Sequence, residues 1–128
     1  MADYGNPAKK MAPTMKRIST HILDLVYGKP ASAVPVRLEK QNSGGDWRLL
    51  NSAHSDQDGR CTQLLPEGED LSAGVYRLIF DTGSYFARQK AEALYPVVEV
   101  TFQAREGESH FHIPLLLSPN GYSTYRGS

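Results

Sequence analysis

The sequence predicts an all-β domain, a sandwich of antiparallel sheets with one short helix. Three observations support this fold class. Apolar and polar residues alternate along seven or eight short segments, which is the pattern of half-buried strands. Turn-forming residues separate these segments, as in the Asn-Ser-Gly-Gly-Asp stretch at 42–46. A single stretch, residues 84–94, contains good helix formers and neither glycine nor proline.

The first predicted strands are bounded by clear turn residues. Residues 18–26 are apolar with polar residues interleaved, and Gly-Lys-Pro at 28–30 ends that strand. In 34–39 valine and leucine alternate with charged residues, and Pro35 near the start suits a strand end or an edge. The strand pattern resumes at 47–50 after the 42–46 turn.

The middle of the chain contains a tight turn, a strand and the helix. Asp-Gly at 58–59 predicts a tight turn that places Arg60 directly after it. Residues 75–80 alternate so that both faces of a strand are usable. The helix is predicted over 84–94, with Ser84 as its N-cap.

Three further strands are predicted after the helix. Pro96 ends the helical stretch, and residues 98–103 then alternate strictly between apolar and polar side chains. Residues 110–117 form another apolar-rich strand, and 122–128 form a last short one.

Composition and charge exclude several classes of protein. The 128 residues suffice for one domain. Fourteen basic and fourteen acidic residues give a formal charge of zero, whereas a general nucleic-acid binder carries a clear positive excess. No run approaches the roughly 18 apolar residues that a membrane helix needs. We therefore expect neither a nucleic acid nor a membrane as partner.

The two ends and the single cysteine bear on organisation and location. Residues 1–16 are predicted to be a flexible leader or tag, because they hold all three methionines and little that would pack in a core, which leaves 17–128 as the β-sandwich domain. Cys61 cannot form an internal disulfide, which favours a reducing compartment. The chain does not end in the Ser-Lys-Leu peroxisomal signal. We expect a cytoplasmic protein and leave a peroxisomal location open.

His21 is the first candidate for chemistry, because it interrupts an apolar strand. It shares a strand face with Ser19 and Leu23, so one side of its surroundings is polar and the other apolar. A histidine there is either a hydrogen-bonded core or interface residue or a general base, since its ordinary pKa of about 6.5 lets it accept a proton near neutrality.

His110 and His112 are the second candidate site. Residues two apart on a strand lie on the same face, about 6.6 Å apart along the strand. Two imidazoles so placed indicate a catalytic pair, a metal pair or simply a polar strand face. A zinc site needs at least a third ligand, for which His21 and Cys61 qualify only if the fold brings them close.

The C-terminal stretch is the third candidate. Arg126 is the only formal charge between 109 and 128, beside tyrosines and hydroxyl side chains. Such a tail either frays into solvent or holds a planar, carbonyl-rich or anionic ligand. The sequence contains no Gly-x-Ser-x-Gly, Cys-x-x-Cys or His-Glu-x-x-His motif and no glycine-rich phosphate loop, which removes the common hydrolase, redox, zincin and nucleotide signatures.

Four segments together resemble the transthyretin-related 5-hydroxyisourate hydrolases of urate degradation. Residues 19–24 (Ser-Thr-His-Ile-Leu-Asp) and 58–61 (Asp-Gly-Arg-Cys) are similar to the first two signatures of that family. Residues 111–119 (Phe-His-Ile-Pro-Leu-Leu-Leu-Ser-Pro) resemble the third. Tyr-Arg-Gly-Ser at 125–128 resembles the tetrapeptide that distinguishes the hydrolases from transthyretin proper.

The resemblance implies a fold and an activity. The fold is a transthyretin/prealbumin-like antiparallel β-sandwich of two four-stranded sheets, assembled as a homotetramer, a dimer of dimers with its sites where the dimers meet. The activity is hydrolysis of the small, purine-derived 5-hydroxyisourate to 2-oxo-4-hydroxy-4-carboxy-5-ureidoimidazoline, without a cofactor or metal. The alternatives are a non-catalytic carrier that binds aromatic hormones in the central channel, and a zinc protein that uses the histidine pair.

The resemblance also implies site residues, one motif at a time. The catalytic histidines are His21 and His112, and neither is singled out as base or acid. Arg60 clamps the substrate and stabilises developing charge. The tail closes the pocket, so that the implied catalytic residues are His21, Arg60, His112 and Ser128, and the implied substrate-binding residues are His21, Arg60, Tyr125 and Arg126. These groups are expected to converge on one cavity between subunits.

Overall fold

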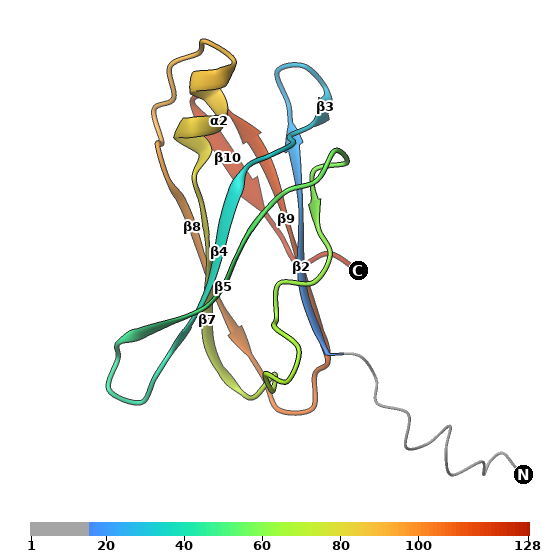
Figure 1. The fold of residues 1–128 in the computed structure, drawn as a ribbon, viewed down its shortest axis with the longest axis vertical. Helices are drawn as coiled ribbons and strands as arrows, with labels where there is room; N and C mark the ends of the chain where they lie inside the picture. Colours follow the sequence, from blue (N-terminus) through green and yellow to red (C-terminus); the bar gives the residue numbers. More distant parts are fainter. Residues whose placement is uncertain (1–15) are drawn as a thin grey trace, which may run out of the picture.

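Two β-sheets packed face to face make up the part of the chain described by the computed structural model, residues 16–128 (Figure 1). One sheet has the strand order β10–β9–β2–β3, and β6 also pairs with β2; the other has the order β5–β4–β7–β8. The strands are β2 (Arg17–Asp24), β3 (Lys29–Pro30), β4 (Pro35–Gln41), β5 (Trp47–His54), β6 (Arg60–Cys61), β7 (Gly74–Phe80), β8 (Val98–Ala104), β9 (His110–Ser118) and β10 (Gly121–Thr124).

The two packed sheets confirm the predicted fold class, but the number of strands in one sheet differs from the expectation. The first sheet has five strands instead of the expected four, because the two-residue strands β3 and β6 both pair with β2. The predicted leader lies outside the described residues except for Lys16, whose ammonium is 3.2 Å from a carboxylate oxygen of Asp70. No helix within residues 16–128 has the length and apolar character that crossing a bilayer requires.

The pairing of β2 with β9 is parallel, which departs from the expectation of purely antiparallel sheets. The register is continuous from Arg17 opposite His110 to Asp24 opposite Leu117. Every other strand pair in the two sheets is antiparallel over the described residues. Parallel neighbours need a long crossover, and here the whole second sheet lies between β2 and β9 in the chain. Alternation along one segment does not reveal such a distant partner.

The hydrophobic core lies between the two sheets and is filled by alternate residues of each strand. Phe102 of β8 contacts both Tyr76 of β7 and Phe111 of β9, with ring centroids 5.8 and 5.7 Å apart, so aromatic contacts join the two sheets. The inward, buried residues of β2 and β9 are Ile18, Thr20, Ile22, Asp24, Phe111, Ile113, Leu115 and Leu117. Because side chains alternate between faces, the histidines of β2 and β9 lie on the outer face of the first sheet.

The helix α2 (Thr82–Arg88) is shorter and earlier than the predicted 84–94. Its N-cap is Asp81, whose carboxylate accepts a hydrogen bond from the Ser84 backbone N–H at 3.1 Å, so Ser84 is not the cap. Aspartate is favoured at this position because its negative charge faces the positive end of the helix dipole. The helical stretch is interrupted by Lys90, which has a positive φ of 58°.

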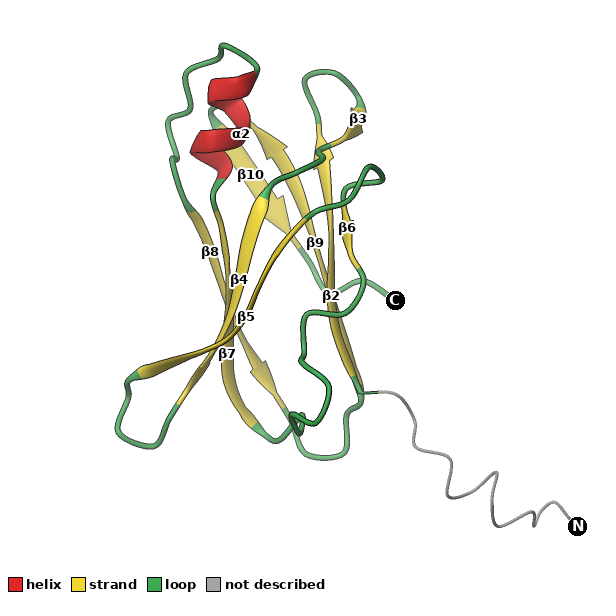
Figure 2. Ribbon diagram, viewed as in Figure 1, coloured by secondary structure: helices red, strands yellow, loops and turns green. Residues whose placement is uncertain are grey.

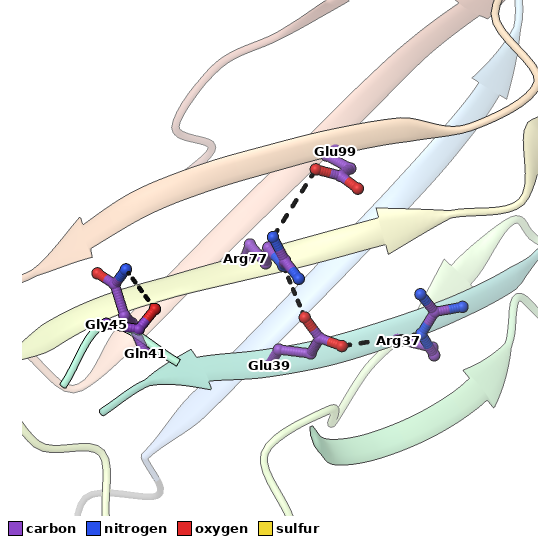
Figure 3. A network of polar contacts seen from close by, with 6 residues as sticks. All are labelled: Arg37, Glu39, Gln41, Gly45, Arg77 and Glu99. Atoms are coloured by element: carbon purple, nitrogen blue, oxygen red, sulfur yellow. Dashed lines mark hydrogen bonds and ion pairs between the residues drawn. The ribbon is translucent and has the colours of Figure 1, made fainter. Parts of the chain in front are cut away.

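The outer face of the second sheet is occupied by paired charges (Figure 3). The Arg77 guanidinium lies 2.6 Å from one carboxylate oxygen of Glu39 and 3.9 Å from Glu99, and Arg37 approaches the other oxygen of Glu39 at 4.0 Å. Arg77 also stacks over the Trp47 ring, 4.1 Å from its centroid. These charged side chains form ion pairs with one another.

A buried carboxylate ties the end of β2 to the helix. Asp24 is 1% exposed, and its Oδ1 accepts hydrogen bonds from the backbone N–H groups of Val26 and Tyr27 at 2.9 and 3.2 Å. The Tyr85 hydroxyl of α2 donates to Oδ2 at 2.6 Å. Burial, and then this hydrogen bond, raise the pKa of Tyr85 above its ordinary value.

We expect Tyr85→Phe to lower the free energy of unfolding by about 1.5–3 kcal/mol, the range for a hydrogen bond to a charged group. The matched control is Tyr76→Phe, which removes a hydrogen bond from an equally buried tyrosine to the neutral Ser72 carbonyl and should cost about 0.5–1.5 kcal/mol. Urea denaturation at one fixed protein concentration measures both. Equal losses would contradict the role of the buried carboxylate.

Candidate active site

Strand register brings histidines from two distant segments onto one sheet face. In the parallel β2–β9 pair, Arg17 is opposite His110, Ser19 is opposite His112 and His21 is opposite Pro114. On the other side of β2, the antiparallel strand β6 places Arg60 opposite His21 (Figure 2 shows β6 beside β2). His21, Arg60 and His112 therefore lie on one face of the first sheet in the single chain. Their convergence on one cavity between subunits stays a prediction.

Arg60 is held against β2 by the turn that precedes it. Gly59 has a φ of +77°, and a Cβ at this position would lie 2.4 Å from the Ile22 carbonyl oxygen. Only glycine permits this close approach, in which the Ile22 N–H donates to the Gly59 carbonyl at 2.7 Å. The Asp56 carboxylate accepts hydrogen bonds from the N–H groups of Asp58 and Arg60, each at 2.9 Å. This local geometry explains why Asp-Gly precedes the arginine.

The His112 ring is held from two sides. Its Nδ1 lies 2.8 Å from the Ser19 hydroxyl, which also lies 3.4 Å from Nε2 of His110. On another edge, the chain tail packs so closely that a Cβ on Gly127 would lie 2.5 Å from Cδ2 of His112. The Gly127 N–H donates to the His112 carbonyl at 2.7 Å, which fixes the tail across β9.

A depression of about 160 Å³ opens beside these groups. Its lining contains two arginines, two histidines and four hydroxyl residues, and no aspartate or glutamate. A concave site of this composition favours negative charge on a ligand or on a reacting oxygen. The lining residues are Arg17, Ser19, Thr20, Arg60, Thr62, His110, His112 and Ser128.

The surroundings of His112 lower its pKa below the ordinary value. Desolvation is the largest cause, because half-burial disfavours the charged imidazolium. Electrostatic interactions with His110, Arg60 and His21 act in the same direction. A lowered pKa favours the neutral imidazole of His112, which is the form that accepts a proton from water.

His21 does not line this depression in the single chain. Tyr125 and Arg126 do not line it either. They line a separate apolar hollow of about 250 Å³ beside Phe111. The Arg126 guanidinium stacks over the Phe111 ring and donates to the Glu108 carboxylate at 2.9 Å and to the His110 carbonyl at 3.1 Å. Gly127 pairs with His112 at the edge of β9, and Ser128 then lines the depression.

Sequence reasoning missed five residues of the depression, which are Arg17, Ser19, Thr20, Thr62 and His110. Arg17 and Ser19 lie on the same face of β2 as His21. Their proximity to His110 and His112, however, depends on the register with β9, which was not predicted. His110 was recognised as a neighbour of His112, yet not as a residue of this pocket, and Thr62 carried no signal. The alternation of side chains along β2 was the one signal that would have indicated Arg17 and Ser19.

The arrangement does not supply the extra ligand that the zinc alternative needs. Cys61 is buried, on the face of β6 opposite to Arg60, and pairs with the core residue Thr20. Burial, with a smaller effect of Asp56, raises the pKa of its thiol to about 11. Residues 16–128 contain no group of three or more histidine, cysteine, aspartate or glutamate side chains able to hold a metal ion.

Known proteins are similar to this chain in both sequence and fold. Residues 18–127 match the model of the HIUase/Transthyretin family. A 5-hydroxyisourate hydrolase from Salmonella typhi is 47% identical over 122 residues, which cover 95% of this chain and 88% of that protein. The solved 5-hydroxyisourate hydrolase of Klebsiella pneumoniae has a TM-score of 0.77 at 38% identity, covering 89% of this chain and all of the other. Transthyretin from Sparus aurata has a TM-score of 0.80 at 35% identity, covering 86% of this chain and 95% of that one.

Backbone similarity does not separate the hydrolase from the transthyretin, because both superpose almost equally well. A match over residues 18–127 shows that this chain belongs to the HIUase/Transthyretin family.

Proposed function

We propose that this protein is a 5-hydroxyisourate hydrolase, which converts 5-hydroxyisourate to 2-oxo-4-hydroxy-4-carboxy-5-ureidoimidazoline in urate degradation. The observation that carries the proposal is the placement of His112, held by Ser19, in a depression that Arg60 and Arg17 also line and that has no acidic side chain. The relatives named 5-hydroxyisourate hydrolase support the same substrate.

The reaction adds water across a ring amide bond. The water oxygen bonds to the carbonyl carbon, its proton passes to a base, and negative charge develops on the carbonyl oxygen. The carbon–nitrogen bond then breaks, the nitrogen receives a proton, and the carbonyl carbon becomes a carboxylate. The site must therefore supply a base, an oxyanion partner and a proton donor.

In the proposed mechanism His112 is the base. Its Nδ1 contacts Ser19, which leaves Nε2 for the reacting water. Arg60 stabilises the oxyanion, because a guanidinium stays protonated and offers several donors in a fixed plane. His21, opposite Arg60 on β2, then delivers a proton to the departing nitrogen.

The tail has two proposed roles. Ser128 lines the depression and contributes a hydroxyl to the bound substrate. Tyr125 and Arg126 act outside the depression: the contacts of Arg126 with Glu108 and with the His110 carbonyl anchor the tail, so that Gly127 stays against His112. These roles modify the direct substrate contact that the resemblance implied for both residues.

We also propose that the working unit is a homotetramer, a dimer of dimers, in the cytoplasm. A depression of about 160 Å³ is small for a ligand site, and a second copy facing it would complete the enclosure. The turn after β2 supports such a contact, since its apolar side chains Leu25, Val26 and Tyr27 are each more than half exposed. The free, buried thiol of Cys61 is consistent with a reducing compartment.

Replacing either proposed catalytic histidine should abolish most of the activity. We expect His112→Ala and His21→Ala each to lower kcat/KM about 10²–10⁴-fold, the contribution of a positioned acid or base. The assay follows the absorbance decay of 5-hydroxyisourate made in situ from urate and urate oxidase, against a blank without the protein. The matched control is His54→Ala, which removes an exposed histidine of β5 and should leave the rate unchanged.

The same assay separates the hydrolase from a carrier. Decay no faster than the blank, together with saturable binding of an aromatic ligand, would support the carrier and refute the proposed function. A wild-type rate in the His112→Ala variant would refute the assignment of the base.

The low pKa of His112 predicts the pH dependence. Because the pKa lies below about 6.5, the base stays neutral as the pH falls to that value, and kcat/KM should decline only at lower pH. Removing a neighbouring positive charge with Arg60→Gln should raise the pKa of the His112 imidazole, whose titration can be followed by NMR without any substrate. An unchanged or lower midpoint in that variant would contradict the electrostatic coupling.

Gly127→Ala should displace either the tail or the His112 ring, because the added Cβ would lie 2.5 Å from Cδ2 of His112. We expect at least a tenfold loss of kcat/KM and a shift in the His112 ring signals. The matched control is Gly121→Ala in β10, where the nearest atom would be 3.9 Å away and neither property should change. Full activity of Gly127→Ala would show that the tail does not position the base.

A further inference from the structure

We propose that Ser19 is a positioning residue for His112: its hydroxyl, shared with His110, determines which ring nitrogen of His112 carries the proton. This inference rests on the proposed function, because it concerns the base of that reaction. Ser19 stands opposite His112 in the β2–β9 register and is 6% exposed, so water competes little for its hydroxyl.

The contacts of the hydroxyl form a short chain of three polar groups. Oγ of Ser19 lies 2.8 Å from Nδ1 of His112 and 3.4 Å from Nε2 of His110, and the two rings are 6.3 Å apart between centroids. A serine hydroxyl has one proton and two lone pairs. It can donate to one imidazole while it accepts from the other, so the state of one ring is coupled to the state of the other.

Only one direction of these hydrogen bonds leaves His112 able to accept a proton from water. When Nδ1–H of His112 donates to Ser19 and the Ser19 hydroxyl donates to Nε2 of His110, Nε2 of His112 keeps its lone pair for water. In the opposite direction, Ser19 donates to Nδ1 of His112, and the neutral ring then carries its proton on Nε2. That tautomer cannot deprotonate water.

The charges around the ring favour the productive direction. The cationic and titratable groups of this face are Arg17 and His21 from β2, Arg60 from β6 and His110 from β9. A nitrogen lone pair is better placed than an N–H group in a depression of positive potential. Ser19 favours the same tautomer, because its hydroxyl oxygen accepts a hydrogen bond from the Nδ1–H of His112, which would otherwise lack an acceptor.

Ser19→Ala tests the proposal with two readouts. The first is the tautomer of His112, measured from the ¹⁵N shifts of its imidazole in protein labelled at histidine, with no substrate present. We expect mainly protonated Nδ1 in the wild type and a substantial population of protonated Nε2 in Ser19→Ala. The second is hydrolysis, in which kcat should fall about tenfold, the equivalent of one hydrogen bond, while KM stays within about twofold.

Conservative and matched variants separate positioning from a general loss of stability. Ser19→Thr keeps the hydroxyl and should restore both the tautomer and most of kcat. Ser55→Ala removes another buried serine hydroxyl, which bonds to the Ala31 carbonyl and the Val34 N–H away from the depression. It should lower the melting temperature without changing the tautomer of His112. If Ser19→Ala does not fold, Ser19→Cys replaces the hydroxyl with a weaker donor of similar shape and should show the same tautomer shift.

The outcomes of the two readouts are independent. Wild-type protein that fails to hydrolyse 5-hydroxyisourate would refute the proposed function, whereas the tautomer measurement would still decide the role of Ser19. An unchanged His112 tautomer in folded Ser19→Ala or Ser19→Cys would overturn the positioning role, even in an active enzyme. A tautomer shift that Ser19→Thr reverses would support it.

Discussion

The parallel pairing of β2 with β9 is the constraint on which the rest of the structure depends. It runs without interruption from Arg17 opposite His110 to Asp24 opposite Leu117. It places Ser19 in contact with His112 across 93 residues of sequence. Side chains alternate along both strands, so a slip of one residue would exchange the core face for the outer face. The buried residues that hold this register therefore also position the candidate active site.

The electrostatics of the site follow from that arrangement. The sheet holds two arginines and three histidines on one face. Both arginines and two of the histidines line the depression, whose lining contains no acidic side chain. Partial burial, and then the electrostatic effect of the neighbouring groups, lower the pKa of His112 and favour its neutral form. Arg60 remains charged. One neutral base beside a permanent cation is the combination that attack of water on an amide requires.

Proteins named hydrolase and proteins named transthyretin share the fold of this chain. The hydrolase from Klebsiella pneumoniae and the transthyretin from Sparus aurata have nearly the same TM-score against this chain. The inner faces of both sheets here form an ordinary apolar core. The outer face of the second sheet carries mutually paired ions around Glu39 and Arg77. The activity that we propose therefore rests on a few side chains of the outer face of the first sheet.

The sequence alone determined the strands, their apolar faces and the turn before Arg60, because these depend on local periodicity and on the backbone freedom of Gly59. It also carried the motifs that indicate His21, Arg60 and His112. Only the tertiary structure decided that β2 and β9 are parallel, that Ser19 bridges two histidines and that Arg126 lies apart from the depression. These features arise from contacts between residues far apart in the chain, and the alternation within a single strand carries no information about which strand lies beside it.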